Sequence, residues 1–391
     1  MDQTPNQDDR QLFTMLKSLQ QASKDLQNSS IFATNKPQSA IELFLDLENK
    51  ANALLSNDPN LFKVSQILCN LKTLVEKLQK YQGYSLLCIF RRQIINYKIY
   101  RVACEMETEI QAYFDREDVE NLVETLEDSD EYDEDEKVRV LIEFEERLSQ
   151  GFDLYFQDLI LKAKVFSILE FLLCDSSCST RIRDQVSLAI AALVRFNKDV
   201  FVGLVLMGPT VRALISMSSS CSIRVLSLLI QFIRIPLVDE LEAYKEIPRI
   251  INLLSSENVS IQVGAMDCIL GITYYGRSEA IEAMIEAGLV EKLMELQRLE
   301  TQCQMNGNET NSENGEKSSR KMESDEGDYS ENCPFEGCVT RFAVQLEAGE
   351  VLSKKEKKEF KLEILRRIRA ASVSEAESAA IVAEVLWGSL S

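Results

Sequence analysis

The sequence predicts an all-α protein built around a stack of repeated helices. Apolar residues recur at spacings of three and four in most segments, which is the pattern of one helix face. Seven prolines and fourteen glycines in 391 residues leave few helix breakers. Between residues 181 and 298, short and long apolar runs alternate and return at intervals of about 40 residues. Because a unit of this length cannot bury its apolar face alone, we predict an α-solenoid.

The first part of the chain predicts a helical bundle over residues 1–126. Four segments place their apolar side chains on one helix face: 12–19, 39–55, 61–81 and 85–113. The second of these follows Pro37 and precedes a turn-forming Asn57–Asn60 cluster. The helices lack the period of the later repeats, so we expect a bundle rather than another part of the solenoid.

An acidic run separates the predicted bundle from the repeats. Residues 127–136 contain eight acids in ten positions. A calcium-binding loop is excluded, because the D-x-[DN]-x-[DN]-G spacing lacks its glycine. We therefore predict a solvated linker over residues 127–137.

The repeats themselves predict a solenoid over residues 138–299. The long apolar runs 186–197, 223–234 and 263–274 are each expected to form the third helix of a unit. Shorter runs at 209–217, 247–254 and 289–296 are expected to form second helices. The segment Lys164–Leu172 is expected to form the second helix of the first unit, and Arg181–Asn197, which includes the run 186–197, its third.

The end of the chain predicts an insertion followed by a helical cap. Residues 300–337 are acidic and poor in aliphatic side chains, which predicts disorder. Helical spacing returns in the predicted cap, residues 338–391, and Val339–Ala348 is expected to supply the third helix that the last unit lacks. A basic helix over 354–369 follows. A last helix, capped by Ser374, is expected to bury Ile381, Val382, Val385, Leu386 and Trp387.

Composition excludes several classes of function. The chain has no histidine, so Ser-His-Asp and Cys-His catalytic pairs cannot form. A net charge of -20 disfavours nucleic acid and anionic membranes as partners. The chain shows no secretory signal, and its ten cysteines are expected to be reduced, buried residues of a cytoplasmic protein that also enters the nucleus.

No motif in the sequence predicts catalysis, a cofactor or a metal. No carboxylate pair accompanies a nucleophile, and no phosphate-binding loop of the G-x-x-x-x-G-K-[ST] type is present. Cys333–Cys338 is half of a zinc knuckle without a second ligand pair. We therefore expect no catalytic residue, no metal, no cofactor and no small-molecule substrate.

The phrase Ala283–Val290 resembles the turn between the first and second helices of armadillo repeats. Gly208, Glu246 and Gly288 fill the glycine slot of that turn in successive units. The segments 91–99 and 107–112 resemble the helical region of plant armadillo proteins that carry a U-box. Neither the C-P-I nor the M-x-D-P-V phrase of a U-box occurs, so the resemblance implies a plant-type armadillo protein without that module.

The resemblance implies a concave surface of third helices that holds another protein. The positions for the family's groove asparagine correspond to Arg195, Gln231 and Gly271, and those for its tryptophan to Ala191, Ser227 and Asp267. Because the family's asparagine and tryptophan are absent from these positions, we expect the surface to contact an acidic or polar peptide. The candidate groove residues are Arg195, Arg224, Gln231 and Asp267.

The function expected from these observations is a non-enzymatic scaffold that binds a partner protein. Two alternatives stay open at this point: a regulatory partner of a ubiquitin ligase, and a membrane-tethering armadillo protein. For the basic helix 354–369, the sequence allows contact with the chain's own acidic tracts, with a membrane or with a partner.

Overall fold

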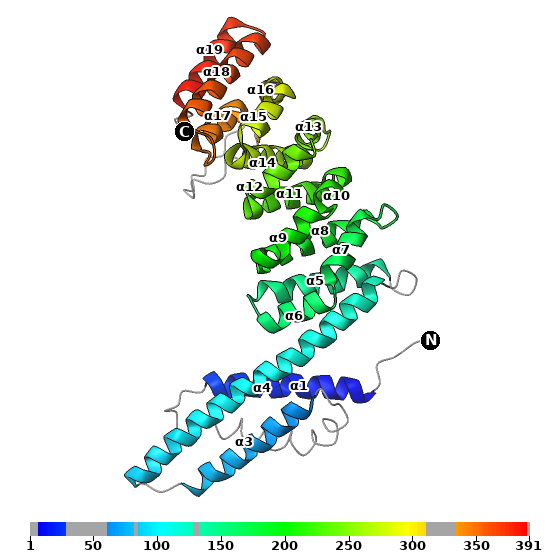
Figure 1. The fold of residues 1–391 in the computed structure, drawn as a ribbon, viewed down its shortest axis with the longest axis vertical. Helices are drawn as coiled ribbons and strands as arrows, with labels where there is room; N and C mark the ends of the chain where they lie inside the picture. Colours follow the sequence, from blue (N-terminus) through cyan, green and yellow to red (C-terminus); the bar gives the residue numbers. More distant parts are fainter. Residues whose placement is uncertain (1–6, 29–60, 82–84, 128–132, 310–333, 389–391) are drawn as a thin grey trace, which may run out of the picture. The chain divides into compact units, whose positions relative to one another are not determined.

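The structure is a computed structural model that describes residues 7–28, 61–81, 85–127, 133–309 and 334–388. Every regular element within these ranges is helical. The chain divides into two compact units, which we call the N-terminal unit and the C-terminal unit (Figure 1). The N-terminal unit contains residues 1–124 and 153–163, and the C-terminal unit contains 125–152 and 164–391. The predicted all-α fold class is confirmed.

The N-terminal unit is a helical bundle. Its helices are α1 (Gln7–Asn28), α3 (Phe62–Lys80), most of α4 (Leu86–Glu127) and α6 (Leu154–Lys162). One apolar core joins α1, α3 and α4, with Leu19, Leu71 and Met106 at 2% exposure or less. The helix α4 runs 14 residues past its predicted end at Tyr113, because Phe114, Val119, Leu122 and Leu126 continue the buried stripe. The predicted helix over 39–55 lies outside the described residues.

The C-terminal unit is a stack of short helices. In chain order they are α5 (Glu134–Ser149), α7 (Val165–Cys174), α8 (Thr180–Phe196), α9 (Lys198–Met207), α10 (Thr210–Met217), α11 (Ser220–Ile233), α12 (Ile235–Ala243), α13 (Ile247–Asn252), η2 (Leu253–Ser255), α14 (Val259–Tyr275), α15 (Ser278–Glu286), α16 (Leu289–Glu309), α17 (Cys338–Ala348), α18 (Lys354–Ala371) and α19 (Glu375–Trp387).

The predicted third helices stack on one another in chain order. The helix α8 packs on α11, α11 on α14 and α14 on α17, and we call these four helices the third-helix ladder. The helix α5 packs on α8 and α19 packs on α17, so both ends of the ladder are covered. This succession of repeated helices, each stacked on its neighbours, is the predicted α-solenoid.

Two glycines allow the closest approach within the ladder. A Cβ atom on Gly271 would lie 2.8 Å from Cγ2 of Ile230, and one on Gly264 would lie 3.1 Å from Cγ2 of Ile223. Both glycines lie on α14 and both isoleucines on α11, seven residues apart in each case. The missing side chains therefore fix how α11 and α14 pack.

The helix α17 completes the last repeat, as expected from residues 339–348. It contacts α14 and α16, although residues 310–333 between α16 and α17 lie outside the described part of the chain. The Cys338 thiol donates to the carbonyl of Leu293 at 3.2 Å, and the Glu350 amide donates to the carbonyl of Tyr274 at 3.0 Å. The helix α16 continues to Glu309, beyond the predicted second-helix run 289–296 and the predicted end of the solenoid at 299, because Glu, Gln and Met are good helix formers.

The acidic run predicted as a linker is helical where it is described. Glu127 ends α4, Asp133 caps α5, and Glu134–Glu136 form the first turn of α5. Acidic residues stabilise a helix N-terminus because they face its unpaired amide groups. The run is therefore partly a helix start, which its charge density alone did not indicate.

The turns before the second helices differ in their backbone conformation. Gly288 has φ of 79°, as the glycine slot predicts. In the middle turn Lys245 takes the positive φ of 55°, one residue before the predicted slot at Glu246. Gly208 has an extended backbone with φ of -98°, and a Cβ atom there would strike the Glu170 carboxylate. The middle turn thus places its positive φ one residue before the predicted slot, and Gly208 has no positive φ.

The last helix corrects one expectation about burial. Ser374 caps α19 as predicted, accepting a hydrogen bond from the Glu377 amide at 3.1 Å. Ile381 and Val385 are buried and Val382 is half-buried, but Leu386 is 49% and Trp387 is 81% exposed. These two residues occupy the end of the stack, where no further helix among the described residues covers them.

Candidate functional site

The third-helix ladder leaves one continuous stripe of side chains uncovered. Its helices bury the faces that touch their neighbours and the layers behind them. On α8, α11 and α14 the exposed or half-buried residues of this stripe recur every three or four positions, and on α17 they follow Arg341 at positions 344 and 345. They are Leu188, Ala192 and Arg195 on α8, Arg224, Leu228 and Gln231 on α11, Val263, Asp267 and Leu270 on α14, and Arg341, Val344 and Gln345 on α17.

All four candidate groove residues lie on this stripe and are exposed. Arg195 is in the last turn of α8, Arg224 and Gln231 lie on α11, and Asp267 is on α14. The packing of Ile223 and Ile230 against the two glycines of α14 sets the level of each residue. Arg224 therefore lies level with Val263, and Gln231 lies level with Leu270.

The positions assigned to the family's groove residues are not structurally equivalent. Ala191 and Ser227 are buried, whereas Asp267 is exposed. Gly271 faces Ile230 inside the helix packing. The third helices pack with their own registers, and alignment by apolar runs is accurate only to about one residue. On the observed stripe Asp267 corresponds to Leu228 and Ala192.

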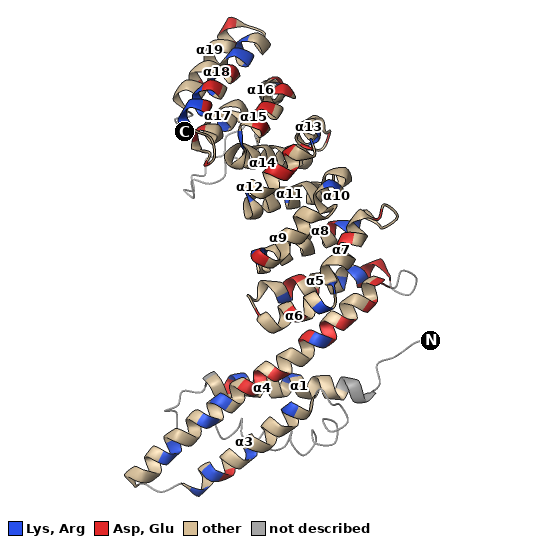
Figure 2. Cartoon of the chain, viewed as in Figure 1, with Lys and Arg blue, Asp and Glu red and all other residues tan. Residues whose placement is uncertain are grey.

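The ladder differs in charge from the rest of the chain. Its four helices carry five arginines, no lysine and only three acids: Asp184, Asp267 and Glu347. A sixth arginine, Arg234, directly follows α11 and is exposed, and we count it with the stripe. The whole chain has a net charge of -20, and the ribbon in Figure 2 is coloured for acidic residues on many of the other helices. The stripe is therefore a basic surface on an acidic protein.

The exposed arginines of the stripe make no ion pair with a carboxylate within the described residues. Arg195 has no polar partner there, and Arg224 contacts only the Cys221 thiol. Arg234 lies over the Tyr275 ring, 5.8 Å from its centroid. Arg341 donates to the carbonyl of Pro334 at 2.9 Å. These guanidinium groups are open to an external acceptor.

Arginines elsewhere in the C-terminal unit are mostly paired. Arg277 donates to Asp239 at 3.0 Å, and Arg249 donates to Glu246 at 2.8 Å. Arg298 pairs with Glu377 at 2.5 Å and donates to the carbonyl of Ala371 at 2.6 Å. The availability of the stripe arginines is thus a property of their place in the fold.

Two carboxyl groups near the stripe are affected by burial. Partial burial raises the pKa of Asp267, and the Arg341 guanidinium on the next helix acts in the opposite direction. Burial raises the pKa of Glu145, on α5, to about 7, although Gln185 donates to this carboxyl at 2.6 Å. The second group therefore titrates near neutral pH and reduces the negative charge beside the ladder.

The cysteines correct the expectation that they are mostly buried. Of those described, only Cys268 and Cys338 are buried, whereas Cys69 and Cys174 are exposed. Burial raises the pKa of the Cys338 thiol to about 12, which disfavours the reactive thiolate. The expectation failed because a cysteine within an apolar run can lie at the edge of the buried face.

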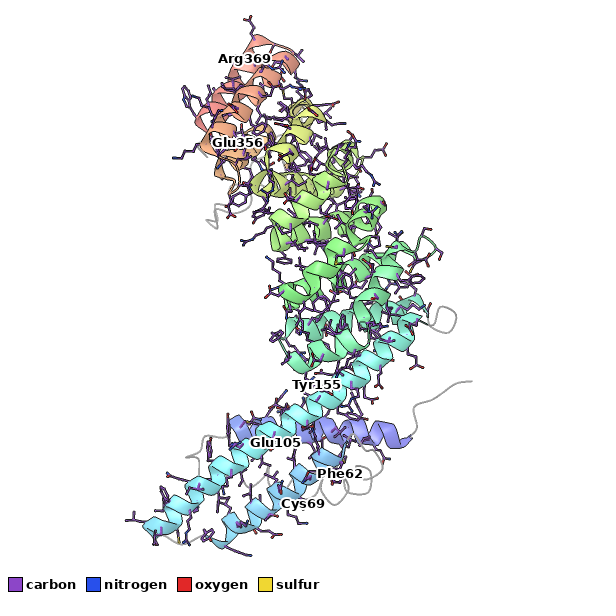
Figure 3. The ribbon with its side chains drawn as sticks, in the orientation of Figure 1. Phe62, Cys69, Glu105, Tyr155, Glu356 and Arg369 are labelled. Carbon is purple, nitrogen blue, oxygen red and sulfur yellow. The ribbon has the colours of Figure 1, made fainter. Side chains whose placement is uncertain are left out.

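The basic helix α18 packs into the stack, in part through its own charges. Lys357 donates to the carbonyls of Glu347 and Gly349 at 2.9 and 2.6 Å, and Arg367 pairs with Glu291 at 3.1 Å. Its buried apolar face consists of Ile364, Leu365 and Ile368. Glu356 and Arg369 lie at opposite ends of this helix (Figure 3). Its neighbours among the described helices are α15, α16, α17 and α19.

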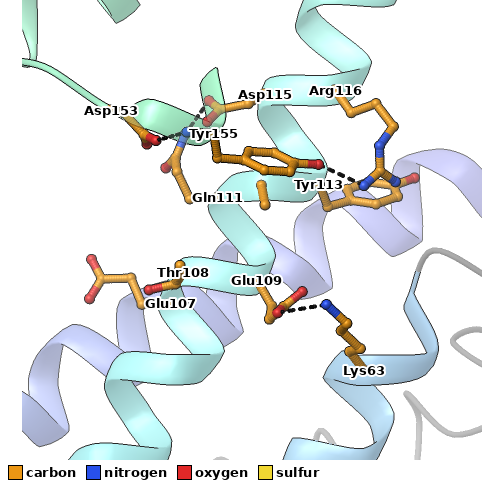
Figure 4. A pocket seen from close by; sticks show the side chains of 11 residues that line it. Lys63, Glu107, Thr108, Glu109, Gln111, Tyr113, Asp115, Arg116, Asp153 and Tyr155 are labelled. Atoms are coloured by element: carbon orange, nitrogen blue, oxygen red, sulfur yellow. Dashed lines mark hydrogen bonds and ion pairs between the residues drawn. The ribbon is translucent and has the colours of Figure 1, made fainter. Parts of the chain in front are cut away.

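A polar pocket of about 450 Å³ lies in the N-terminal unit (Figure 4). Its walls include Lys63, Tyr113 and Asp153, and its acids outnumber its basic residues. The polar groups engage one another: Arg116 donates to the Tyr155 hydroxyl at 2.8 Å, and Lys63 pairs with Glu109 at 3.3 Å. Sequence reasoning missed this pocket because it joins residues from distant segments, and none of them forms a motif.

Neither a metal cluster nor a single spanning helix occurs within the described ranges. No group of three or more cysteine, aspartate or glutamate side chains there is arranged to hold a metal ion. None of the individual helices described is long and apolar enough to cross a bilayer, while α9 and α10, bent by 70° relative to each other, satisfy the test only together.

Several solved structures are similar to this chain, although their sequences share little identity with it. No model of a known protein family matches the chain, and no curated protein sequence matches it. Similar solved structures include "Designed armadillo repeat protein YIII(Dq)4CqI", with 16% identity, 68% of this chain and 99% of that chain covered, and a TM-score of 0.43. A designed armadillo repeat protein in complex with peptide (KR)4 has 18% identity, coverage of 69% and 98%, and a TM-score of 0.42.

A karyopherin also has a similar structure. Kap121p, bound to the extreme C-terminus of the protein phosphatase Cdc14p, has 12% identity and a TM-score of 0.42. The match covers 95% of this chain and 32% of the karyopherin. The chain thus corresponds to about a third of that protein's length.

Proposed function

We propose that the protein is a non-enzymatic scaffold that binds an extended segment of a partner protein along the third-helix ladder. The observation that carries this proposal is the continuous stripe, which crosses four stacked helices without interruption. It offers guanidinium and amide donors, with aliphatic side chains between them. Such alternation suits a peptide that is held through its backbone and its side chains together.

The helices that carry the stripe are also rigidly packed, which favours binding. Both ends of the ladder are covered by further helices, and Leu226, Leu229 and Ile269 on the ladder helices are fully buried. The donors are thus carried by packed helices and are already placed before a partner arrives. Preorganised donors reduce the entropy that binding must overcome.

Site-specific crosslinking tests this proposal. A photoreactive residue in place of Leu228, at the centre of the stripe, should crosslink peptides that a random displayed library yields against the full chain. The same residue in place of Leu204 on α9, which is 39% exposed and away from the stripe, is the matched control. Equal crosslinking from both positions, or no peptide enriched at all, would refute a binding function for the stripe.

A further inference from the structure

We infer that the segment bound by the third-helix ladder is acidic, with its carboxylates or phosphates placed opposite Arg195, Arg224, Arg234 and Arg341. This inference rests on the proposed function and specifies the chemistry of the partner. It depends on charges that only the folded chain brings onto one surface.

The first step is the separation of charge between helix layers. The helices α12 and α15 carry six acids and no basic residue. The ladder carries five arginines against three acids. Arg181 pairs with Asp135 and Glu347 pairs with Lys361, which leaves four arginines and two acids. A partner that approaches the C-terminal unit therefore meets positive potential at the ladder and negative potential at α12 and α15. Electrostatic complementarity of this kind selects partners and speeds their association.

The second step is the availability of the arginines. Binding a carboxylate at Arg195 or Arg224 requires no internal ion pair to break, because neither makes one within the described residues. The guanidinium group also presents a planar fork that matches carboxylate and phosphate oxygens. Lysine is absent from all four ladder helices. The donor set thus favours oxyanions in a fixed geometry.

The third step is the order of charges along the ladder. Adjacent packed helices lie about 8–10 Å apart, and an extended peptide advances about 3.3 Å per residue, so one helix step corresponds to about three residues. Arg195 and Arg224 lie on the neighbouring helices α8 and α11, but Arg195 is level with Gln231, so the two arginines are also about 10 Å apart along the helix direction. Arg341, on α17, lies two steps beyond α11, with Asp267 on α14 between them. We therefore expect two acids about four residues apart, then a neutral or basic residue, and a further acid about six residues beyond the second.

Fluorescence anisotropy with designed peptides tests this order. Four labelled peptides share one polar host sequence and carry Glu, phosphoserine, Gln or Lys at the three acidic positions. The full chain should bind the Glu or phosphoserine peptide at least about tenfold more tightly than the Gln peptide, and the Lys peptide least. Affinity should fall as salt rises, because the contacts are exposed and screened. The two acidic arms distinguish carboxylate from phosphate recognition.

Charge reversal locates the contact. Arg224→Glu together with Arg341→Glu should weaken the acidic peptide by about tenfold or more, with an unchanged circular dichroism spectrum. The control is Arg369→Glu on α18, which reverses an exposed arginine outside the ladder and should leave affinity unchanged. An equal loss in the control variant would contradict the inference, since bulk charge would then explain the binding.

The outcomes separate this inference from the proposed function. If the Gln or Lys peptide binds as tightly as the acidic peptides and still crosslinks from position 228, the ladder is a binding surface and its acidic preference is wrong. If no peptide of any charge binds or crosslinks, both proposals fail. If the spacing of acids is immaterial but acids are required, the charge argument holds and the predicted register is wrong.

Discussion

The ladder helices and the outer helices of the same solenoid differ in the share of residues that they bury and in the charged residues that they carry. The helix α11 has eight buried residues among its fourteen, and its one charged residue is Arg224. The helix α15 buries four of nine, and all three of its charged residues are glutamates. A helix enclosed by two neighbours and a layer behind it has a single narrow stripe for polar residues. An outer helix has a broad solvated face, so acidic surplus collects there.

The two groups of helices also differ in whether their arginines pair with acids of the same chain. Arg277 and Arg298 join elements by pairing with acids. The stripe arginines contact a thiol, a ring or a carbonyl, or have no polar partner, within the described residues. The acidic surplus of the chain therefore does not extend to the ladder.

Leu229→Ala should produce the largest loss of stability. Leu229 is fully buried in α11, so its removal leaves a cavity that costs about 2–5 kcal/mol. Leu204→Ala on α9, where the side chain is 39% exposed, should cost less than about 1 kcal/mol. Urea unfolding followed by circular dichroism measures both. Similar losses would mean that the outer layer supports the stack as much as the ladder does.

Gly271→Ala should destabilise the chain by about 1–3 kcal/mol, because the new methyl group would lie 2.8 Å from Ile230. At Gly203, in the middle of α9, a Cβ atom would have no neighbouring atom within 4 Å. Gly203→Ala should therefore raise stability by about 0.5–1 kcal/mol through helix propensity. Thermal unfolding measures both changes. Opposite signs for one chemical change would confirm close packing in the ladder, whereas a stabilised Gly271→Ala variant would show that α11 and α14 can move apart.

Arg298→Ala should lower the stability with which α18 and α19 pack against α16 by about 1–2 kcal/mol. The guanidinium group joins α16 to Glu377 and to the carbonyl of Ala371, and both charged side chains are less than a third exposed. Hydrogen exchange of the α19 amides should report the change. Arg277→Ala removes an exposed pair with Asp239 and should cost at most about 1 kcal/mol. Unchanged protection of α19 would show that apolar packing alone holds the pair.

Glu145→Gln should give the smallest effect, visible as a change in pH dependence. Burial raises the folded-state pKa from 4.5 to about 7, so the folded chain binds the extra proton between these values. The contribution of Glu145 to stability is therefore most favourable below pH 4.5 and is lost as pH rises through 7. The variant should match the wild type at low pH and, after solvent screening of this partly exposed group, exceed it by on the order of 1 kcal/mol at pH 8. Urea unfolding across this pH range measures the difference, and parallel stability profiles would refute this titration.

Sequence periodicity predicted most of the helices, but it did not predict which of their side chains are buried. The long apolar runs gave α8, α11 and α14, because a helix needs only its own hydrogen bonds and one repeated face. The same runs did not distinguish Ser227, which is buried, from Leu228, which is half-buried. Side-chain exposure depends on the register of neighbouring helices, and one residue of uncertainty turns a side chain by about 100°.

The candidate site shows the same limit. Arg195, Arg224, Gln231 and Asp267 were selected from helix spacing, and all four are exposed on the stripe. Their role in binding stays a prediction. Arg234 and Arg341 were missed, although a charge count over the predicted third helices, extended past residue 337, would have indicated both. The polar pocket of the N-terminal unit had no signal in any single segment.

The sequence by itself determined the helical class, the repeat period and the scarcity of charge on the third helices. These are local or compositional properties, set by backbone propensity and by the fraction of each helix that must be apolar. The levels at which the ladder helices pack, by contrast, follow from the folded chain, in which Gly264 and Gly271 of α14 face Ile223 and Ile230 of α11. The reason is that packing register depends on the shapes of two surfaces at once, and one segment of sequence contains one of those shapes without its partner.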